Sequence, residues 1–158
     1  MTIREYREQD REVLKEITAI CFEGVSIDQN IQKIAGLING KDWTWRKKRH
    51  IDADIAADPA GVFVAEADGR CIGYVTTRVD RATKVGSIPN LAVLPEHRKG
   101  GIGRKLMDTA VARLKTEGME CVRIETLDQN AVGRHFYPAY GFTEVARQLH
   151  YFKKIAGA

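Results

Sequence analysis

The sequence predicts an α/β fold in a single domain of residues 1–158, and three observations support this. Segments with strand-like alternation interchange along the chain with segments whose apolar residues recur at helical spacing. A chain of 158 residues is long enough for one hydrophobic core and short for two. No internal repeat, low-complexity tract or linker divides the sequence.

The first part of the chain is predicted to form a strand followed by helices. Residues 2–6 read as a short strand, and Asp10 caps a helix whose apolar positions share one face. A second helix is expected over residues 27–38, because Asn39-Gly40 supplies a stop signal. A third helix is expected at about residues 43–57.

The rest of the chain is predicted to alternate strands and helices. Residues 62–66 and 71–79 read as an antiparallel hairpin, with Asp68-Gly69 as its turn signal. A long amphipathic helix is expected over about 102–117, where Gly118 ends it. The other expected elements are strands at 85–94 and 121–127, a short helix at 130–140, and a closing pair of strands at 142–146 and 149–155.

Composition and charge narrow the class of protein. Hydrophobic residues make up 44% and charged residues 29%, which excludes a disordered chain. The cysteines Cys21, Cys71 and Cys121 lie too far apart for a disulfide framework or a zinc knuckle, so we expect reduced thiols. With no apolar segment of signal-peptide or membrane-spanning type, a cytoplasmic location is expected. The formal charge of +4 favours an anionic ligand, either a phosphorylated cofactor or a nucleic acid.

A basic, glycine-rich segment between a strand and a helix carries the main chemical signal. Residues 91–106 read LAVLPEHRKGGIGRKL, so glycines and cations stand where the helix begins. The first helical turn leaves backbone N–H groups unpaired, and glycines let phosphate oxygens approach them. A Rossmann loop would need glycine at Leu106, and a P-loop would need Ser or Thr after its lysine. The alternative is that the glycines have only a structural role, in the turn that connects the strand to the helix.

Two motifs, Arg98-Lys99-Gly100-Gly101-Ile102-Gly103 and then the segment from Asn130 to Phe142, in this order resemble the GNAT acetyltransferase superfamily. Arg98-Lys99-Gly100-Gly101-Ile102-Gly103 has that family's Arg/Gln-x-x-Gly-x-Gly/Ala form. The segment from Asn130 through Gly133, Phe136 and Tyr137 to Gly141-Phe142 is similar to its Asn-x-x-Ala-x-x-Leu/Phe-Tyr-x-x-x-Gly-Phe pattern. Gly133 replaces the more usual Ala.

The resemblance implies a fold, a co-substrate and a set of binding residues. The fold would be a mixed, mostly antiparallel sheet with helices on both faces, whose central strands separate to hold the pantetheine arm of acetyl-CoA. The activity would be transfer of an acetyl group from acetyl-CoA to a primary amine, without a metal. The residues implied to bind the cofactor are Leu91, Ala92, Val93, Arg98, Lys99, Gly100, Gly101, Ile102, Gly103, Arg104, Lys105, Asn130 and Tyr137.

Two residues are candidates for proton transfer. Tyr137 occupies the motif position of the family's general acid, where a phenol can donate to the departing thiolate; alternatively it only packs its helix on the sheet. Residues 124–130, IETLDQN, resemble the Leu-Glu-Val-x-x-x-Asn strand of ribosomal-protein alanine acetyltransferases, whose Glu is a base. Glu125 is therefore the candidate base, with an ordinary solvated strand residue as the alternative.

Other interpretations remain open. Trp43 and Trp45 beside the basic run 46–49 could bind nucleic acid or line an acceptor pocket, but core tryptophans with a solvated basic face are expected instead. A non-catalytic acyl-CoA-binding module is a second alternative, against which Tyr137 argues. A homodimer is possible, no membrane is expected as a partner, and the amine acceptor, whether a small molecule or a protein, has no signature in the sequence.

Overall fold

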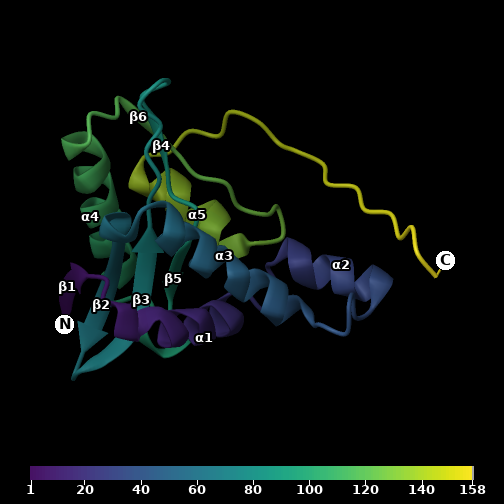
Figure 1. Cartoon of the computed structure of the whole chain (residues 1–158). Coiled ribbons are helices and arrows are strands. Elements are labelled where there is room, and N and C mark those ends of the chain that lie inside the picture. Colours follow the sequence, from purple (N-terminus) through teal and green to yellow (C-terminus); the bar gives the residue numbers. More distant parts are fainter. Residues whose placement is uncertain (158) are drawn as a thin grey trace.

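The computed structural model describes residues 1–157 and contains an α/β arrangement of strands and helices (Figure 1). The helices are α1 (Arg11–Cys21), α2 (Ile27–Ala35), α3 (Trp43–Ala57), α4 (Ile102–Thr116) and α5 (Ala131–Tyr140). The strands are β1 (Thr2–Glu5), β2 (Val62–Ala67), β3 (Arg70–Thr76), β4 (Val85–Ser87), β5 (Leu91–Val93) and β6 (Cys121–Arg123). Short 3-10 turns cover Glu8–Asp10, Pro59–Gly61 and Pro95–His97.

The strands form two hydrogen-bonded groups. Strands β1, β2, β3 and β5 make an antiparallel sheet in that order, while β4 pairs with β6 in parallel. An isolated bridge between Arg78 and Ser87 joins the chain after β3 to β4. The predicted mixed, mostly antiparallel sheet with flanking helices is confirmed.

The predicted strand at 85–94 is divided in the middle, which separates the two groups. Pro89 has no N–H to donate, so it cannot continue a ladder on that side. The last hydrogen bond between this segment and β6 is donated by the Ile88 amide to the Arg123 carbonyl, at 3.1 Å. Beyond it β5 stays on β3, whereas residues 124–127 belong to no strand in the described chain. The predicted strand at 121–127 therefore ends early, and β5 has no hydrogen-bonded strand on the side away from β3 in the described chain. We call this interruption of the strand pairing the gap.

Each face of the antiparallel sheet is covered by helices with its own apolar core. On one face α1 and α3 bury Leu14, Ile17 and Ile51 against β2, β3 and Ala92 of β5. On the other face α4 buries Leu106, Met107 and Ala110 against β2 and β3, and residues of α5 pack beside them. Figure 1 shows the sheet between these helical layers. Both β5 and the turn that follows it are thus held from two sides.

Further predicted elements, one helix and the closing pair of strands, differ from the structure. Helix α2 ends at Ala35, because Gly36 adopts a positive φ of 67°, so the helix predicted to Ile38 is too long. The predicted closing strands at 142–146 and 149–155 are wrong. After Phe142 the chain leaves the body of the molecule in an extended form that joins no strand within residues 1–157 (Figure 1). Its alternating apolar residues suit a strand, but no neighbouring strand is present for it to pair with.

None of the helices that the structure describes combines the length and the apolar character that crossing a membrane requires.

Candidate active site

The start of α4 presents free backbone donors. Its N-cap residue Gly101 makes no side-chain capping hydrogen bond, and the first helical amide with a partner is that of Lys105, which donates to Gly101 at 3.1 Å. The amides of Ile102, Gly103 and Arg104 precede that bond and point out of the helix end. An uncapped helix start of this kind is suited to hold an anion, since the helix dipole adds favourable potential there.

The turn before α4 has the conformation of an anion-binding concavity. Lys99 and Gly101 have positive φ values of 67° and 80°, on either side of Gly100. Such alternation directs successive N–H groups toward the same side. No heavy atom lies within 4 Å of a Cβ built on Gly101, so the space above this turn is open. The turn therefore has unpaired backbone donors and an open position beside Gly101, and its binding of a phosphate stays a prediction.

The start of α4 lies between β5 and α5. A Cβ built on Gly103 would stand 3.5 Å from the Phe136 ring and 4.0 Å from Val93. These are ordinary van der Waals distances, so the start of α4 packs beside both the end of β5 and the Phe136 ring of α5. The same contact brings the two sequence motifs together, since Gly103 belongs to the first and Phe136 to the second.

The basic residues of the turn have different surroundings. The Arg98 Nε donates to the Val93 carbonyl at 2.9 Å, so this guanidinium fixes the turn to β5. The Arg104 guanidinium lies 5.2 Å from the centre of the Tyr140 ring. Lys99 and Lys105 are exposed beside the uncapped amides. Arg98 is held to the strand, whereas the two lysines remain available to pair with a ligand.

The free edge of β5 offers backbone groups toward the gap. In an antiparallel pair, alternate residues direct their N–H and C=O groups to opposite sides. The backbone groups that face β3 belong to Asn90, Ala92 and Leu94. Thus the Thr76 amide donates to the Asn90 carbonyl, and the Leu94 amide donates to the Ile72 carbonyl. Leu91 and Val93 therefore direct their backbone groups toward the gap. The Val93 carbonyl already accepts from Arg98, so the groups left for an extended ligand with amide groups are the Leu91 N–H and C=O and the Val93 N–H.

Tyr137 lies on α5 beside the start of α4. Its ring packs edge-on against Phe136 at 5.6 Å and against Phe142 at 6.0 Å. Burial raises the pKa of Tyr137 to about 12, so the phenol keeps its proton throughout the neutral range. Within residues 1–157 the hydroxyl makes no hydrogen bond, while the ring is held in place on both sides.

Asn130 holds the start of α5. Its side-chain oxygen accepts from the Gly133 amide at 3.2 Å, and its side-chain nitrogen donates to the Thr126 hydroxyl at 2.8 Å. A Cβ on Gly133 would lie only 2.8 Å from that hydroxyl oxygen. Glycine in place of the family's Ala therefore permits this close contact. The structure gives Asn130 a capping role, beside which its predicted contact with the cofactor stays a prediction.

Glu125 lies beyond β6 on the segment that borders the gap. Its side chain is 65% exposed and pairs with Arg123. Val122 and Ile124 pack into the core under α4, so the alternation of an extended chain directs Arg123 and Glu125 toward the face of α1 and α3. Glu125 is thus an exposed carboxylate on the side of the sheet opposite to α4, and its catalytic role remains a prediction.

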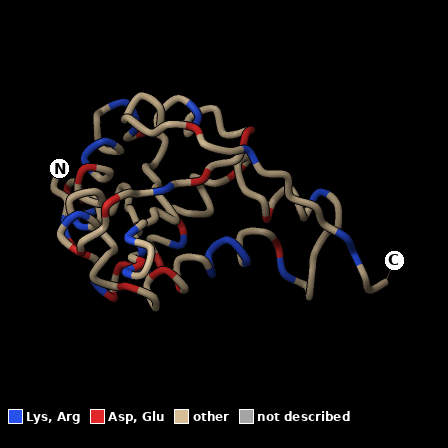
Figure 2. Tube along the Cα trace, turned by 90° about the horizontal axis from the view of Figure 1, so that it is seen from above, with Lys and Arg blue, Asp and Glu red and all other residues tan. Residues whose placement is uncertain are grey.

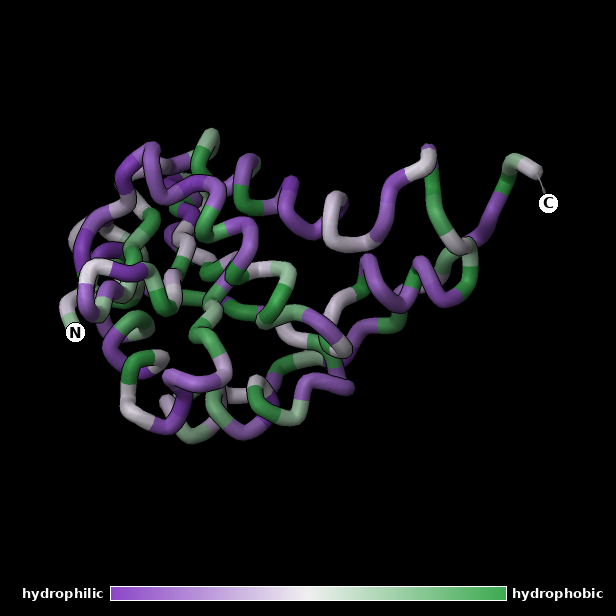
Figure 3. Tube along the Cα trace, turned by 90° about the horizontal axis from the view of Figure 1, so that it is seen from below, coloured by the Kyte–Doolittle hydropathy of each residue, from purple (hydrophilic) through white to green (hydrophobic). Residues whose placement is uncertain are grey.

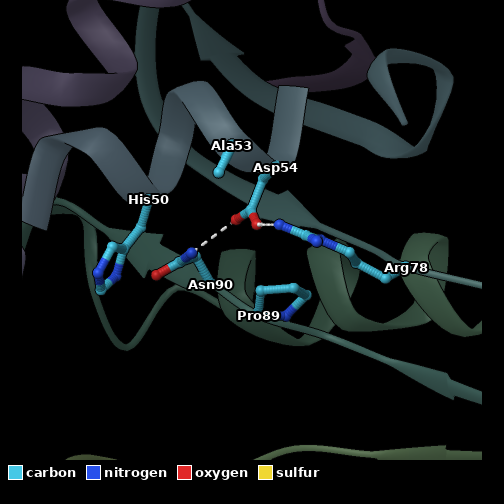
Figure 4. A pocket seen from close by; sticks show the side chains of 6 residues that line it. All are labelled: His50, Ala53, Asp54, Arg78, Pro89 and Asn90. Carbon is cyan, nitrogen blue, oxygen red and sulfur yellow. Dashed lines mark hydrogen bonds and ion pairs between the residues drawn. The ribbon is translucent and has the colours of Figure 1, made fainter. Parts of the chain in front are cut away.

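A buried polar network at the start of β5 was missed by sequence reasoning. Asp54 of α3 is 2% exposed and accepts from Arg78 at 2.7 Å, from Thr76 at 2.9 Å and from the Asn90 amide at 2.7 Å. Figure 4 shows Asp54 between Asn90 and Arg78. These residues line a cavity of about 260 Å³. This network holds Asn90, the residue directly before β5, in place. Its sequence signal is the spacing of Lys47, Ile51 and Asp54, which places two charges on the buried face of α3.

Lys47 extends the same network. Its Nζ donates to Asn90 Oδ1 at 3.0 Å and lies 4.1 Å from the centre of the Phe22 ring. Burial is the main cause that lowers the pKa of Lys47, and burial together with Lys47 lowers the pKa of His50. These contacts define the orientation of the Asn90 side-chain amide, because its oxygen accepts from the Lys47 ammonium and its nitrogen donates to the Asp54 carboxylate.

The tryptophans and the basic run of α3 have intramolecular partners. Trp43 is buried, while Trp45 is exposed between Lys41 and Arg49, whose charged groups lie 5.6 and 4.9 Å from its ring centre. The other cations of the run also have partners: Arg46 pairs with Asp28, Lys47 with Asn90 and Lys48 with Glu16. Figure 2 shows Lys and Arg interspersed with Asp and Glu along the chain.

Solved structures with this fold include acetyltransferases. The PaiA N-acetyltransferase from Thermoplasma acidophilum, solved in complex with coenzyme A, has a TM-score of 0.72 and 23% identity, with 90% of this chain and 89% of that chain covered. The ribosomal-protein-S18-alanine N-acetyltransferase from Escherichia coli has a TM-score of 0.66 and 18% identity, covering 92% and 79% of the two chains. At these identities the likeness establishes the fold.

A curated relative is more similar in sequence. The mycothiol acetyltransferase of Tsukamurella paurometabola is 36% identical over 103 residues, which cover 60% of this chain and 35% of that protein. The matched part thus spans about a third of the length of this relative. The model of the acetyltransferase (GNAT) family matches residues 12–142, which include both motifs, the free edge of β5 and Tyr137. The resemblance stated from the two motifs is confirmed, and the chain belongs to the acetyltransferase (GNAT) family.

Proposed function

We propose that this protein, as a single domain, transfers an acetyl group from acetyl-CoA to a primary amine by direct attack on the thioester. The observation that carries the proposal is the uncapped start of α4, which lies directly at the end of the free edge of β5. A phosphate site and an open strand edge are therefore adjacent. Coenzyme A has a pyrophosphate joined to an extended chain with two amides, which fits this order.

The co-substrate would be held mainly by backbone groups. The amides of residues 101–105 would bind the pyrophosphate, with Lys99 and Lys105 adding charge. The Leu91 N–H and C=O and the Val93 N–H would pair with the pantetheine amides as a neighbouring strand does. The coenzyme A in the related Thermoplasma structure supports acetyl-CoA as co-substrate.

The leaving thiolate needs a donor, and we assign this role to Tyr137. A thiol has a pKa of about 8.5, whereas the pKa of Tyr137 is raised to about 12. Full proton transfer from the phenol is therefore uphill. The hydrogen bond that Tyr137 donates becomes stronger as negative charge develops on sulfur, so it stabilises the transition state more than the ground state.

The attacking amine must lose a proton, and we assign Glu125 as its acceptor. Alkylamines have a pKa of about 10.4 and are mostly protonated at neutral pH. Val122 and Ile124 pack under α4, so the alternation of an extended chain would direct Glu125 to the side of α1 and α3, opposite to the helix that would hold the pyrophosphate. The amine would approach from that side while the cofactor lies across the gap, which separates the two substrates on either side of the thioester.

We also propose that the protein acts in the cytoplasm. Cys21, Cys71 and Cys121 are free thiols, which suits the reducing cytoplasm. The partners for the basic run of α3 favour the enzyme over a nucleic-acid-binding protein, because that run offers few unpaired cations to phosphates.

A direct assay tests the proposal. The full chain would be incubated with acetyl-CoA and separate amines: a peptide N-terminus, a lysine side chain, a polyamine, an amino acid and an aminoglycoside. We expect at least one to yield coenzyme A and an acetylated amine in equal amounts, identified by mass. Binding of acetyl-CoA without transfer to any amine would favour a non-catalytic acyl-CoA-binding module. Salt-dependent binding of RNA or DNA without acetyl-CoA binding would overturn the enzyme.

A further inference from the structure

Lys47 is a buried amine that the proposed mechanism does not use. It is 9% exposed, and its Nζ donates to Asn90 Oδ1 at 3.0 Å and lies 3.4 Å from His50 Nδ1. Neither partner is a carboxylate, and within residues 1–157 Asp28 and Asp54 act on the ammonium group only at longer range. Burial lowers the pKa of Lys47 against the effect of these two carboxylates. More of this side chain is therefore neutral and nucleophilic than of a lysine in water.

Lys47 lies on the side of the gap from which an amine would approach. Helix α3, which carries Lys47, packs on the face of the sheet opposite to α4. Asn90 and His50, which contact its ammonium group, line the cavity of about 260 Å³ that Figure 4 shows. Pro89 lines the same cavity and is the residue at which the predicted strand at 85–94 is divided. The amine of Lys47 is thus adjacent to a cavity at the gap.

The path proposed for acetyl-CoA ends at the same place. The uncapped start of α4 follows the carboxyl end of β5, so a pyrophosphate bound there lies at that end of the strand. The pantetheine chain would then run along the gap from Val93 toward Leu91, and its thioester would lie beyond Leu91. The next residues in that direction are Asn90 and Pro89. The thioester carbonyl would therefore reach the cavity that Lys47 borders.

We propose that Lys47 accepts an acetyl group from the acetyl-CoA bound to its own chain, so that it is a site of self-acetylation. This inference rests on the proposed function, because it requires acetyl-CoA at the gap. The ammonium group first gives one proton to His50 Nδ1, and the His50 side chain, which is 52% exposed, releases that proton to water. The neutral Nζ then attacks the thioester carbonyl, and the C–S bond breaks. The second proton that leaves the nitrogen balances the thiolate, so the products are an amide at Lys47 Nζ and coenzyme A with a free thiol.

Mass spectrometry tests self-acetylation directly. The full chain would be incubated with acetyl-CoA and no added amine, then denatured, digested and mapped. We expect one acetyl group per chain, at Lys47, and one coenzyme A released with it. Lys115, exposed at the far end of α4, is the control lysine, and Lys47 should be acetylated at least about 10-fold faster. Acetyl phosphate, a donor without coenzyme A, should reverse this order, because Lys47 is buried.

Matched variants separate this reaction from simple chemical acetylation. Gly101→Glu should slow acetylation of Lys47 at least about 10-fold and Gly118→Glu by less than about twofold, because only the first blocks the helix start. Lys47→Arg should remove one acetyl group per chain. Lys48→Arg should not, since the neighbouring Lys48 pairs with Glu16 at 2.7 Å.

The possible failures are distinguishable when binding of acetyl-CoA and transfer to an added amine are measured separately. A wild type that binds acetyl-CoA but leaves Lys47 unmodified overturns self-acetylation, whether or not an added amine is acetylated. Equal acetylation of Lys47 in the two glycine variants also overturns it, because the reaction would then not need the bound cofactor. A wild type that does not bind acetyl-CoA overturns the proposed function together with this inference.

Discussion

Replacing Asp54 by Ala should strongly destabilise the fold. The carboxylate is buried and accepts three hydrogen bonds, from Arg78, Thr76 and Asn90. Arg78 is 41% exposed and can turn to water, so its share of the loss is reduced. The Thr76 hydroxyl and the Asn90 amide are buried and would be left without this partner, at about 1–3 kcal/mol each. Breaking a buried charged network of this kind costs about 3–5 kcal/mol in total.

A neighbouring residue on the same helix provides the control for this prediction. Asp52 is 39% exposed and pairs with Arg11 and Lys15. Asp52→Ala gains the same helix propensity as Asp54→Ala but loses only surface ion pairs, which contribute about 0–1 kcal/mol. Urea denaturation should show a much larger loss in the free energy of unfolding for Asp54→Ala than for Asp52→Ala. In thermal denaturation, Tm should fall by roughly 10 °C for Asp54→Ala. Equal losses in the two variants would refute the structural role of this network.

Three further predictions concern proton transfer and pH. Tyr137→Phe should lower kcat about 100-fold and leave the Kd for acetyl-CoA within about twofold, by steady-state kinetics and calorimetry; a parallel loss of binding would contradict the donor role. Glu125→Gln should alter the pH dependence of kcat/KM, whereas Glu120→Gln should not; an unchanged profile would assign the base to water. Arg4 holds the pKa of Asp10 below its usual range. This stabilisation is present above the unfolded-state pKa of about 3.9 and lost as the pH falls through the lower folded-state pKa, so Asp10→Asn should flatten the acid unfolding curve.

The parts of the fold that local signals define could be predicted from the sequence. Gly118 and Gly141 end α4 and α5 with positive φ values of 85° and 127°, and Gly69 turns the β2–β3 hairpin. The uncapped start of α4 could be predicted for the same reason, since a helix start with glycines needs no distant contact. Membership of the acetyltransferase (GNAT) family followed from the two motifs.

The parts that depend on distant contacts could not be predicted. The Asp54 network joins α3 to residues near β3 and β5, and only folding brings Asp54 and Asn90 within 2.7 Å. The separation of β5 from residues 124–127 depends on where parallel pairing with β6 stops, which Pro89 alone did not reveal. Figure 3 shows apolar segments on the chain leading to the C-terminus, outside the body of the molecule. This segment after Phe142 satisfied the pattern of a strand, but a pattern does not say which edge the strand joins.

The central claim, that the uncapped start of α4 holds acetyl-CoA, is tested most directly by calorimetric titration of the wild type, Gly101→Glu and Gly118→Glu. Both glycines have positive φ, 80° and 85°, with nothing within 4 Å of a built Cβ, and they lie at opposite ends of α4. The two variants therefore carry the same strain and charge. We expect Gly101→Glu to weaken acetyl-CoA binding at least about 100-fold and Gly118→Glu to leave it within about threefold. No binding by the wild type, or equal binding by both variants, would contradict the assignment of the phosphate site.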